Sequence, residues 1–243
     1  MLLKQFFLYL LIFWNLSLQA ENLILRENFK KAEKGDFLVA MQGKVLTLFR
    51  IEKNENGQLL LEETSVGSSF FKQQNMTFRN WFEKGASGFT AWNLYEIDLA
   101  SGKMLKSYAF INDQWVEKPV SNSFLPTLLN LELVKIPLNQ RKKIGRTSKN
   151  GEPLYWQPKL QFEGQCMQNI SFDAWLAKWP NDKSELSLKT IEMYTPEDST
   201  LYPAYLPYWL EVGGMVGNAK IRMIDSGKNL NSPHPLNHHG KNL

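Results

Sequence analysis

Residues 89–98 and 103–111 carry the pattern that most constrains the fold of this chain. Both segments are rich in aromatic and branched side chains, and they flank the turn Ala100-Ser101-Gly102, an arrangement typical of a β-hairpin. Successive side chains of a strand point to opposite faces of a sheet, and apolar residues fall on both: Phe89, Ala91, Tyr95 and Ile97 on one face, Trp92 and Leu94 on the other. A sheet with one face in water would alternate apolar with polar residues. We therefore expect that each face of the sheet is at least partly covered.

Segments of the same kind recur along the chain between clusters of turn-forming residues. The predicted strands are residues 37–42, 45–52, 58–66, 114–118, 133–136, 159–163, 186–194, 208–212 and 219–225. Predicted helices are short: residues 77–84, with Thr77 as N-cap, and residues 124–131. The expected fold class is mainly β (α+β), a single curved antiparallel sheet shaped as an open half-barrel, with a few short helices.

A further helix is predicted from an aromatic stripe. Phe172, Trp175, Leu176 and Trp179 have the i, i+3, i+4 and i+7 spacing of one helical face. Pro180 would end such a helix. We expect it either to pack on the sheet or to lie as a lid over an apolar cavity.

The first 20 residues have the organisation of a cleavable signal peptide. Lys4 supplies positive charge, residues 6–18 form an almost unbroken apolar run, and Ala20 is a small residue at the expected cleavage position. The run is shorter than the roughly 20 residues that span a bilayer, so an uncleaved anchor is the weaker alternative. We expect an exported protein, periplasmic or secreted, with no transmembrane segment after cleavage.

The remainder is expected to form one domain. Residues 21–35 form a polar lead-in, and residues 36–226 form the strand-rich half-barrel domain. Residues 227–243 are rich in Gly, Asn, Pro and His, so we expect a disordered tail whose deletion beyond Leu230 leaves folding intact. Within the domain, the basic segment 141–151 is expected to be an exposed loop.

Composition excludes several classes of function. A net charge of +4, with 24 acidic residues interspersed, gives too little asymmetry for a nucleic-acid partner. Cys166 is the only cysteine, so no intramolecular disulfide can form, and we expect it to be a small buried residue. All three histidines lie in the expected tail, at positions 234, 238 and 239. No catalytic residue, metal site or cofactor is therefore predicted.

Two weaker patterns keep an enzymatic hypothesis open. The segment Ile224-Asp225-Ser226-Gly227 resembles the hydrophobic-Asp-Ser-Gly loop of aspartic proteases, although an aspartate that starts a glycine turn after a strand is the simpler explanation. Glu192, Glu211 and Tyr208 could supply carboxylate and tyrosine acid–base chemistry in a concavity of the sheet.

Aromatic residues in the second half of the chain are the candidate ligand-binding residues. Residues 202–209 place four aromatic rings around two prolines, and amphipathic rings of this kind suit the rim of a pocket or an interface. Together with the predicted helix, they give the candidates Trp175, Trp179, Tyr205, Tyr208 and Trp209. The alternative interpretation is that these rings belong to the core.

Several short stretches together resemble a known family. They are Gly35-Asp36-Phe37, Gly43-Lys44, Leu61-Glu62-Glu63, Leu154-Tyr155-Trp156-Gln157-Pro158, Trp179-Pro180-Asn181-Asp182, Leu206-Pro207-Tyr208-Trp209 and Ile224-Asp225-Ser226-Gly227. The set resembles a family of uncharacterised exported proteins from chlamydia-like bacteria, and it implies no activity and no functional residues. The order of strands is also similar to the open half-barrel of periplasmic lipoprotein carriers and the related violacein-pathway fold, a likeness that concerns fold alone.

These observations favour an exported, non-enzymatic protein that binds a hydrophobic ligand, such as a lipid, or an envelope protein, in the manner of a carrier or chaperone. The first alternative is an enzyme with carboxylate and tyrosine chemistry in the same concavity. The second is a protein-interaction module of the cell envelope. An open apolar groove would favour the carrier, a buried carboxylate in a cleft the enzyme, and a flat aromatic patch over a filled core the interaction module.

We predict that the mature protein begins near Glu21 and is soluble without detergent, because a short apolar run is followed by a polar segment. N-terminal sequencing of protein from the native host should show that residues 1–20 are missing. Intact Met1 in a membrane pellet would contradict the export prediction.

Overall fold

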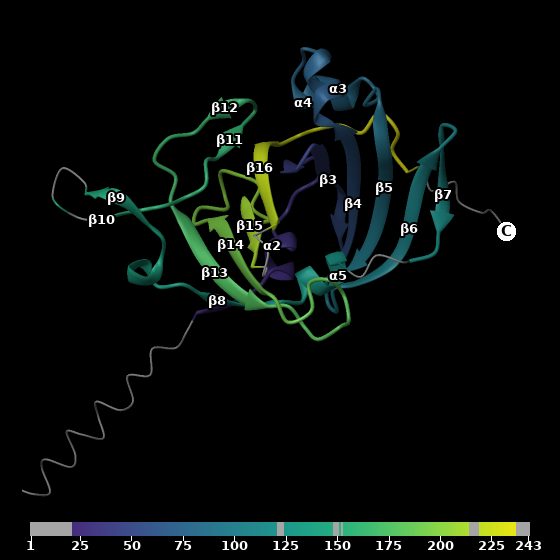
Figure 1. Ribbon diagram of the computed structural model, residues 1–243. Helices are drawn as coiled ribbons and strands as arrows, with labels where there is room; N and C mark the ends of the chain where they lie inside the picture. The colour runs from purple at the N-terminus through teal and green to yellow at the C-terminus, as the bar shows by residue number, and fades with distance from the viewer. Residues whose placement is uncertain (1–20, 121–123, 148–150, 152, 214–218, 237–243) are drawn as a thin grey trace, which may run out of the picture.

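The structure is a computed structural model that describes residues 21–120, 124–147, 151, 153–213 and 219–236. The predicted signal peptide, residues 1–20, lies outside the described residues. The main element of the described chain is one sheet of twelve strands, in the order β1-β8-β13-β14-β15-β16-β2-β3-β4-β5-β6-β7. The sheet curves without closing into a barrel (Figure 1). This confirms the predicted mainly β fold with a single curved sheet.

Two antiparallel meanders build the sheet. The first consists of β2 (Phe37–Gln42), β3 (Val45–Glu55), β4 (Gln58–Gly67), β5 (Phe89–Asp98), β6 (Lys103–Ile111) and β7 (Gln114–Lys118). The second consists of β13 (Phe172–Lys178), β14 (Thr190–Pro196), β15 (Trp209–Val212) and β16 (Ala219–Gly227). Antiparallel pairing of β16 with β2 joins them, and β8 (Glu132–Lys135) and β1 (Asn22–Ile24) extend the sheet beyond β13.

The helices are short and lie between strands. They are α2 (Arg26–Phe29), α3 (Ser68–Gln73), α4 (Phe78–Glu83), α5 (Phe124–Leu129) and the 3₁₀ turn η1 (Leu138–Gln140). The predicted N-cap of α4 is confirmed, because the side-chain oxygen of Thr77 accepts a hydrogen bond from the backbone N–H of Asn80. This contact satisfies a donor that the first helical turn leaves free.

The inner face of the sheet carries the larger apolar core. Tyr95 of β5 and Leu210 of β15 belong to the same buried cluster although they come from different halves of the sheet. Strands so far apart can share a cluster only on the concave side of a curved sheet. Phe29 of α2 and Leu128 of α5 are buried in this cluster as well, so these helices cover the inner face.

The outer face is covered too, as the hairpin pattern predicts. Trp92 of β5 and Trp81 of α4 belong to a second buried cluster on this face. Phe89 packs against Trp92, with ring centroids 5.3 Å apart, and not on the Tyr95 side as expected. The register shifts between Ser65 and Val66, which pair with Ala91 and Phe89, so Thr90 is an extra residue in β5. A bulge of this kind reverses the alternation, which places Phe89 on the other face.

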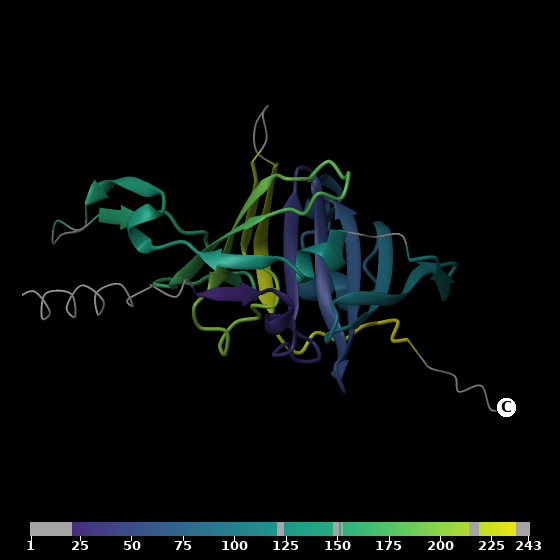
Figure 2. The same cartoon turned by 90° about the horizontal axis from the view of Figure 1, so that it is seen from below.

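The chain after β16 runs across the outer face toward β6 and β7 (Figures 1 and 2). Leu230 is 1% exposed, Trp115 Nε1 donates to the carbonyl of His234 at 2.8 Å, and the His234 ring stacks on Phe110 with centroids 4.4 Å apart. The prediction of a disordered tail is therefore wrong for residues 227–236. The segment is polar in composition, but it packs on the apolar side chains of the outer face. Its composition alone does not show this contact.

A buried ion pair lies under this segment. Arg50 of β3 and Glu62 of β4 are each 1% exposed, and Arg50 Nη1 lies 2.8 Å from Glu62 Oε2. The other carboxylate oxygen accepts hydrogen bonds from Trp92 Nε1 at 2.8 Å and Ser232 Oγ at 2.9 Å. Arg50 Nε donates to the carbonyl of Leu230 at 2.6 Å. The network thus joins three strands to the C-terminal segment.

The predicted helix around Trp175 is a strand. Residues 172–178 form β13, whose whole length pairs with β14, and Trp175 Nε1 donates to Thr195 Oγ1 of that strand at 2.8 Å. Helical spacing was misleading because Ala174 and Trp175, which point to opposite faces of the strand, are both buried. Apolar side chains then occupy both faces of the strand, and the period of two that identifies a strand is lost.

Three smaller expectations also need correction. Part of the predicted basic loop forms β9 (Lys143–Thr147), which pairs with β10 (Pro153–Tyr155) in a ribbon that projects from the sheet (Figures 1 and 2). Cys166 is exposed on the small hairpin of β11 (Gln161–Phe162) and β12 (Gln165–Cys166), not buried. The polar lead-in forms β1 and α2 and is anchored by fully buried apolar side chains.

We predict that Glu62→Ala lowers the free energy of unfolding by about 3 kcal/mol, because it removes the main buried partner of Arg50. Glu55→Ala is the matched control. It removes an exposed partner of Lys53 and should cost less than about 1 kcal/mol. Urea unfolding followed by fluorescence measures both changes, and equal effects would contradict the importance of the buried pair.

We also predict that deleting residues 231–243 destabilises the protein by roughly 2–4 kcal/mol, because the Ser232 and His234 contacts are lost. Deleting residues 237–243 removes none of the described contacts and is the control. Thermal unfolding compares the two variants. A melting temperature unchanged by the longer deletion would show that the segment contributes no stability.

Candidate ligand-binding pocket

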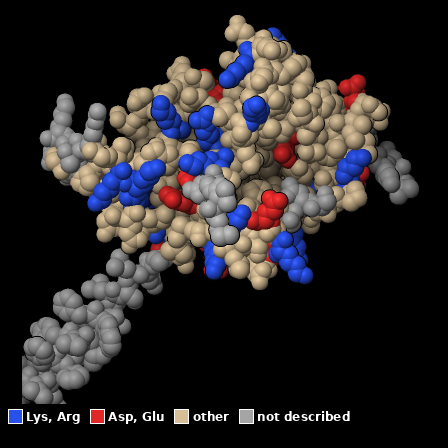
Figure 3. All heavy atoms as spheres, viewed as in Figure 1, with Lys and Arg blue, Asp and Glu red and all other residues tan. Residues whose placement is uncertain are grey.

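An apolar pocket of about 210 Å³ lies on the inner face of the sheet. Strands from both halves of the sheet form its walls, and α5 and the segment before β15 border it. In the view of Figure 3 the surface is hollowed near the middle of the molecule, over β16 and β3. The lining residues are Ala40, Gln42, Thr47, Phe49, Glu63, Tyr95, Phe124, Leu125, Leu128, Leu206, Pro207, Leu210, Ile221 and Met223.

Local sequence explains why the layer of side chains is open here. Ala40 lies between Thr47 and Met223 on the neighbouring strands, and its methyl group is too small to fill the space between them. On the opposite wall, Leu125 and Leu128 of α5 lie three residues apart and so share one face of the helix. The small side chain of Ala40 on the sheet and the leucine side chains of α5 therefore leave unfilled apolar space between the sheet and the helix.

The polar groups of the pocket come from the sheet. Glu63 of β4 accepts a hydrogen bond from the hydroxyl of Tyr95 on β5, with 2.6 Å between the oxygens. Thr47, a further lining residue, is hydrogen-bonded through its hydroxyl to Ser65 at 2.9 Å. Of the described residues that line the pocket, Glu63 alone is charged. The pocket therefore combines an apolar cover with a sheet wall that carries one carboxylate.

The five aromatic residues predicted to bind ligand are not brought together in this pocket. Trp175, Trp179, Tyr205 and Tyr208 are each at most 3% exposed and belong to the core. Tyr205 borders a separate surface hollow, and its hydroxyl donates to the carbonyl of Phe49 at 2.9 Å. These four rings are part of the core and are not among the residues that line the pocket.

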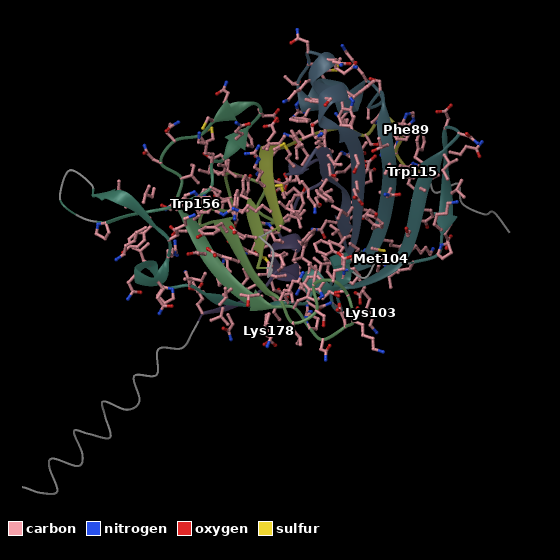
Figure 4. All side chains as sticks on the ribbon, in the orientation of Figure 1. Phe89, Lys103, Met104, Trp115, Trp156 and Lys178 are labelled. Atoms are coloured by element: carbon pink, nitrogen blue, oxygen red, sulfur yellow. The ribbon has the colours of Figure 1, made fainter. Side chains whose placement is uncertain are left out.

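Trp179 and Trp209 have different neighbours. Trp179 supports the pocket indirectly, because its ring stacks on Phe124 of the lining with centroids 5.5 Å apart. Trp209 is half-buried, and Trp156 packs edge-on against it at 4.9 Å. Figure 4 shows Trp156 on the side of the molecule formed by β13 and β14. By strand alternation Trp209 points away from the face that carries Leu210.

The acid–base residues considered for an enzyme do not form a cleft. Glu192 and Glu211 lie opposite each other on β14 and β15, and Glu211 pairs with Lys220 at 3.6 Å. The Tyr208 side chain is buried beside Ser226, and burial raises the pKa of its hydroxyl. A tyrosine whose pKa is raised and which has no solvent access is poorly placed for proton transfer.

Asp225 holds two backbone segments together. Its Oδ1 accepts hydrogen bonds from the N–H groups of Gly164 and Ser226, both at 2.9 Å, and burial raises the pKa of the carboxyl. These contacts support the simpler explanation of the Asp-Ser-Gly sequence. In the described ranges, no group of three or more His, Cys, Asp or Glu residues is arranged to hold a metal ion.

Sequence reasoning missed the lining residues of the pocket. Glu63 was visible as an acidic residue inside an apolar strand, next to a second glutamate. Alternation places such neighbours on opposite faces, and this could have marked Glu63 as a polar group on a covered face. The apolar lining, by contrast, has the same composition as the core.

Fold and pocket together define a mainly β protein with an open, curved sheet and an apolar pocket on its inner face. The chain belongs to the CT021 protein family, whose model matches residues 47–168. The 2.0 Å structure of the hypothetical protein CT021 from Chlamydia trachomatis is similar, with a TM-score of 0.62 and 20% sequence identity over 88% of this chain and 96% of that chain. At this identity the likeness concerns the fold.

No curated protein matches the chain in sequence. Within the described part of the chain, no helix has the length and apolar character needed to cross a membrane.

Proposed function

We propose that this protein is an exported, non-enzymatic protein that binds a hydrophobic ligand in the pocket on the inner face of its sheet, as a carrier or chaperone-like component of the envelope. The observation that supports it most is unfilled apolar space between α5 and the sheet. Protein interiors are close-packed, whereas concave sites with apolar linings and a few polar groups are typical of ligand binding.

The N-terminal sequence supports the location. Residues 1–20 have the pattern of a signal peptide, so the ligand would be met in the periplasm or outside the cell. The open half-barrel shape suits a carrier, because a ligand can enter a curved sheet from its open side without unfolding it.

A second candidate is an enzyme that uses carboxylate and tyrosine chemistry in the same concavity. The contact between Glu63 and the Tyr95 hydroxyl favours it, since a carboxylate and a phenol 2.6 Å apart can exchange a proton. In this hypothesis Glu63 and Tyr95 replace Glu192, Glu211 and Tyr208 as the reacting groups.

We predict that wild-type protein binds N-phenyl-1-naphthylamine, a neutral probe whose fluorescence rises in apolar surroundings. Ala40→Leu should reduce binding at least about fivefold, because the larger side chain fills the pocket. Ala219→Leu, the same change at an exposed position of β16, is the control and should bind as the wild type does. No probe binding by the wild type, or equal binding by both variants, would contradict a ligand site here.

A further inference from the structure

Glu63 is a carboxylate to which the described part of the chain offers no cationic partner. One oxygen accepts the hydrogen bond from Tyr95. Among the residues that the structure describes, no lysine, arginine or histidine forms an ion pair with it. It is partly buried in a pocket whose other lining residues are uncharged. A carboxylate in such surroundings gains from any cation that reaches it.

The preceding residue shows the contrast. Glu62 points to the outer face, where Arg50 and the donors of Trp92 and Ser232 surround its carboxylate. Glu63 points to the inner face, where its donor among the described residues is the Tyr95 hydroxyl. Arg50 thus neutralises the fully buried carboxylate of Glu62. The carboxylate of Glu63, which faces the pocket, is left for a bound ligand to neutralise.

We propose that the pocket selects amphiphiles with a cationic end, and that Glu63 binds this end while the apolar lining takes up the hydrocarbon part. The inference rests on the proposed function, because it names the class of ligand for the same pocket. A primary ammonium group fits best, since it donates three hydrogen bonds as well as carrying the charge. The Tyr95 ring, next to Glu63 in the lining, offers a further attraction for a cation.

The size of the pocket limits the hydrocarbon part. Its volume of about 210 Å³ lies below the roughly 300–1,000 Å³ of sites for drug-sized ligands. A short alkyl chain is therefore the suitable probe. Octylamine, 1-octanol and octanoate share one chain and differ in the charge of the polar end, which is positive, neutral and negative at neutral pH.

The test is a calorimetric titration of wild-type protein with these three compounds at neutral pH. We expect octylamine to bind about tenfold more tightly than 1-octanol, and octanoate to bind most weakly, because a charge-assisted hydrogen bond is gained in the first case and like charges meet in the last. Glu63→Gln should remove the preference for octylamine while leaving the affinity for 1-octanol unchanged.

Two further variants complete the test. Glu96→Gln changes a glutamate of β5 whose side chain points to the face opposite Tyr95, so it should keep the full preference. Tyr95→Phe keeps the carboxylate and removes its protein donor, so it should keep the preference even if Glu63→Gln folds poorly.

The outcomes separate the two proposals. Equal or tighter binding of 1-octanol or octanoate by the wild type would overturn the cationic selectivity but keep the apolar site. A preference for octylamine that survives in Glu63→Gln, or is lost in Tyr95→Phe, would overturn the part assigned to the carboxylate. If none of the three compounds binds, the proposed ligand-binding function fails, and the selectivity with it.

Discussion

The buried pair of Arg50 and Glu62 is the constraint on which much of this fold depends. Two charges removed from water are costly unless each is paired and hydrogen-bonded. Here β5 contributes a donor through Trp92, and the C-terminal segment contributes both Ser232 and the carbonyl of Leu230. The C-terminal segment must therefore lie across the outer face for the pair to be satisfied.

A close approach supports the same arrangement. Gly35 has a φ of +85°, and a Cβ at this position would lie 2.9 Å from the Cα of Asn229. The backbone N–H of Leu230 donates to the carbonyl of Gly35 at 2.9 Å. The glycine before β2 thus allows the backbone at Asn229 and Leu230 to pack directly against it. This contact covers the outer face next to the β16–β2 pairing that connects the two meanders.

The C-terminal segment covers the outer face, and the proposed ligand site lies on the inner face. There the curvature of the sheet brings residues of β5 and β15 around one pocket, whose space is bounded by α5. The adjacent residues Glu62 and Glu63 have different roles, one in stability and one in the proposed ligand site. Glu62 takes part in the stabilising network outside, and Glu63 gives the pocket its one charged group among the described lining residues. In this proposal one strand, β4, serves stability on one face and recognition on the other.

The sequence by itself determined the mainly β architecture and many of its strands. The segments around the turn at Ala100 coincide with β5 and β6, and their two-sided apolar pattern predicted the covered sheet, because alternation is a local property of a strand. It could not determine that residues 172–178 form a strand, because covering both faces removes the period that separates strand from helix. Nor could it distinguish lining from core, since Met223 of the pocket and the buried Trp179 are both apolar. Only the tertiary structure decided which apolar side chains meet a partner and which border empty space, because that depends on the packing of strands and helices far apart in the chain.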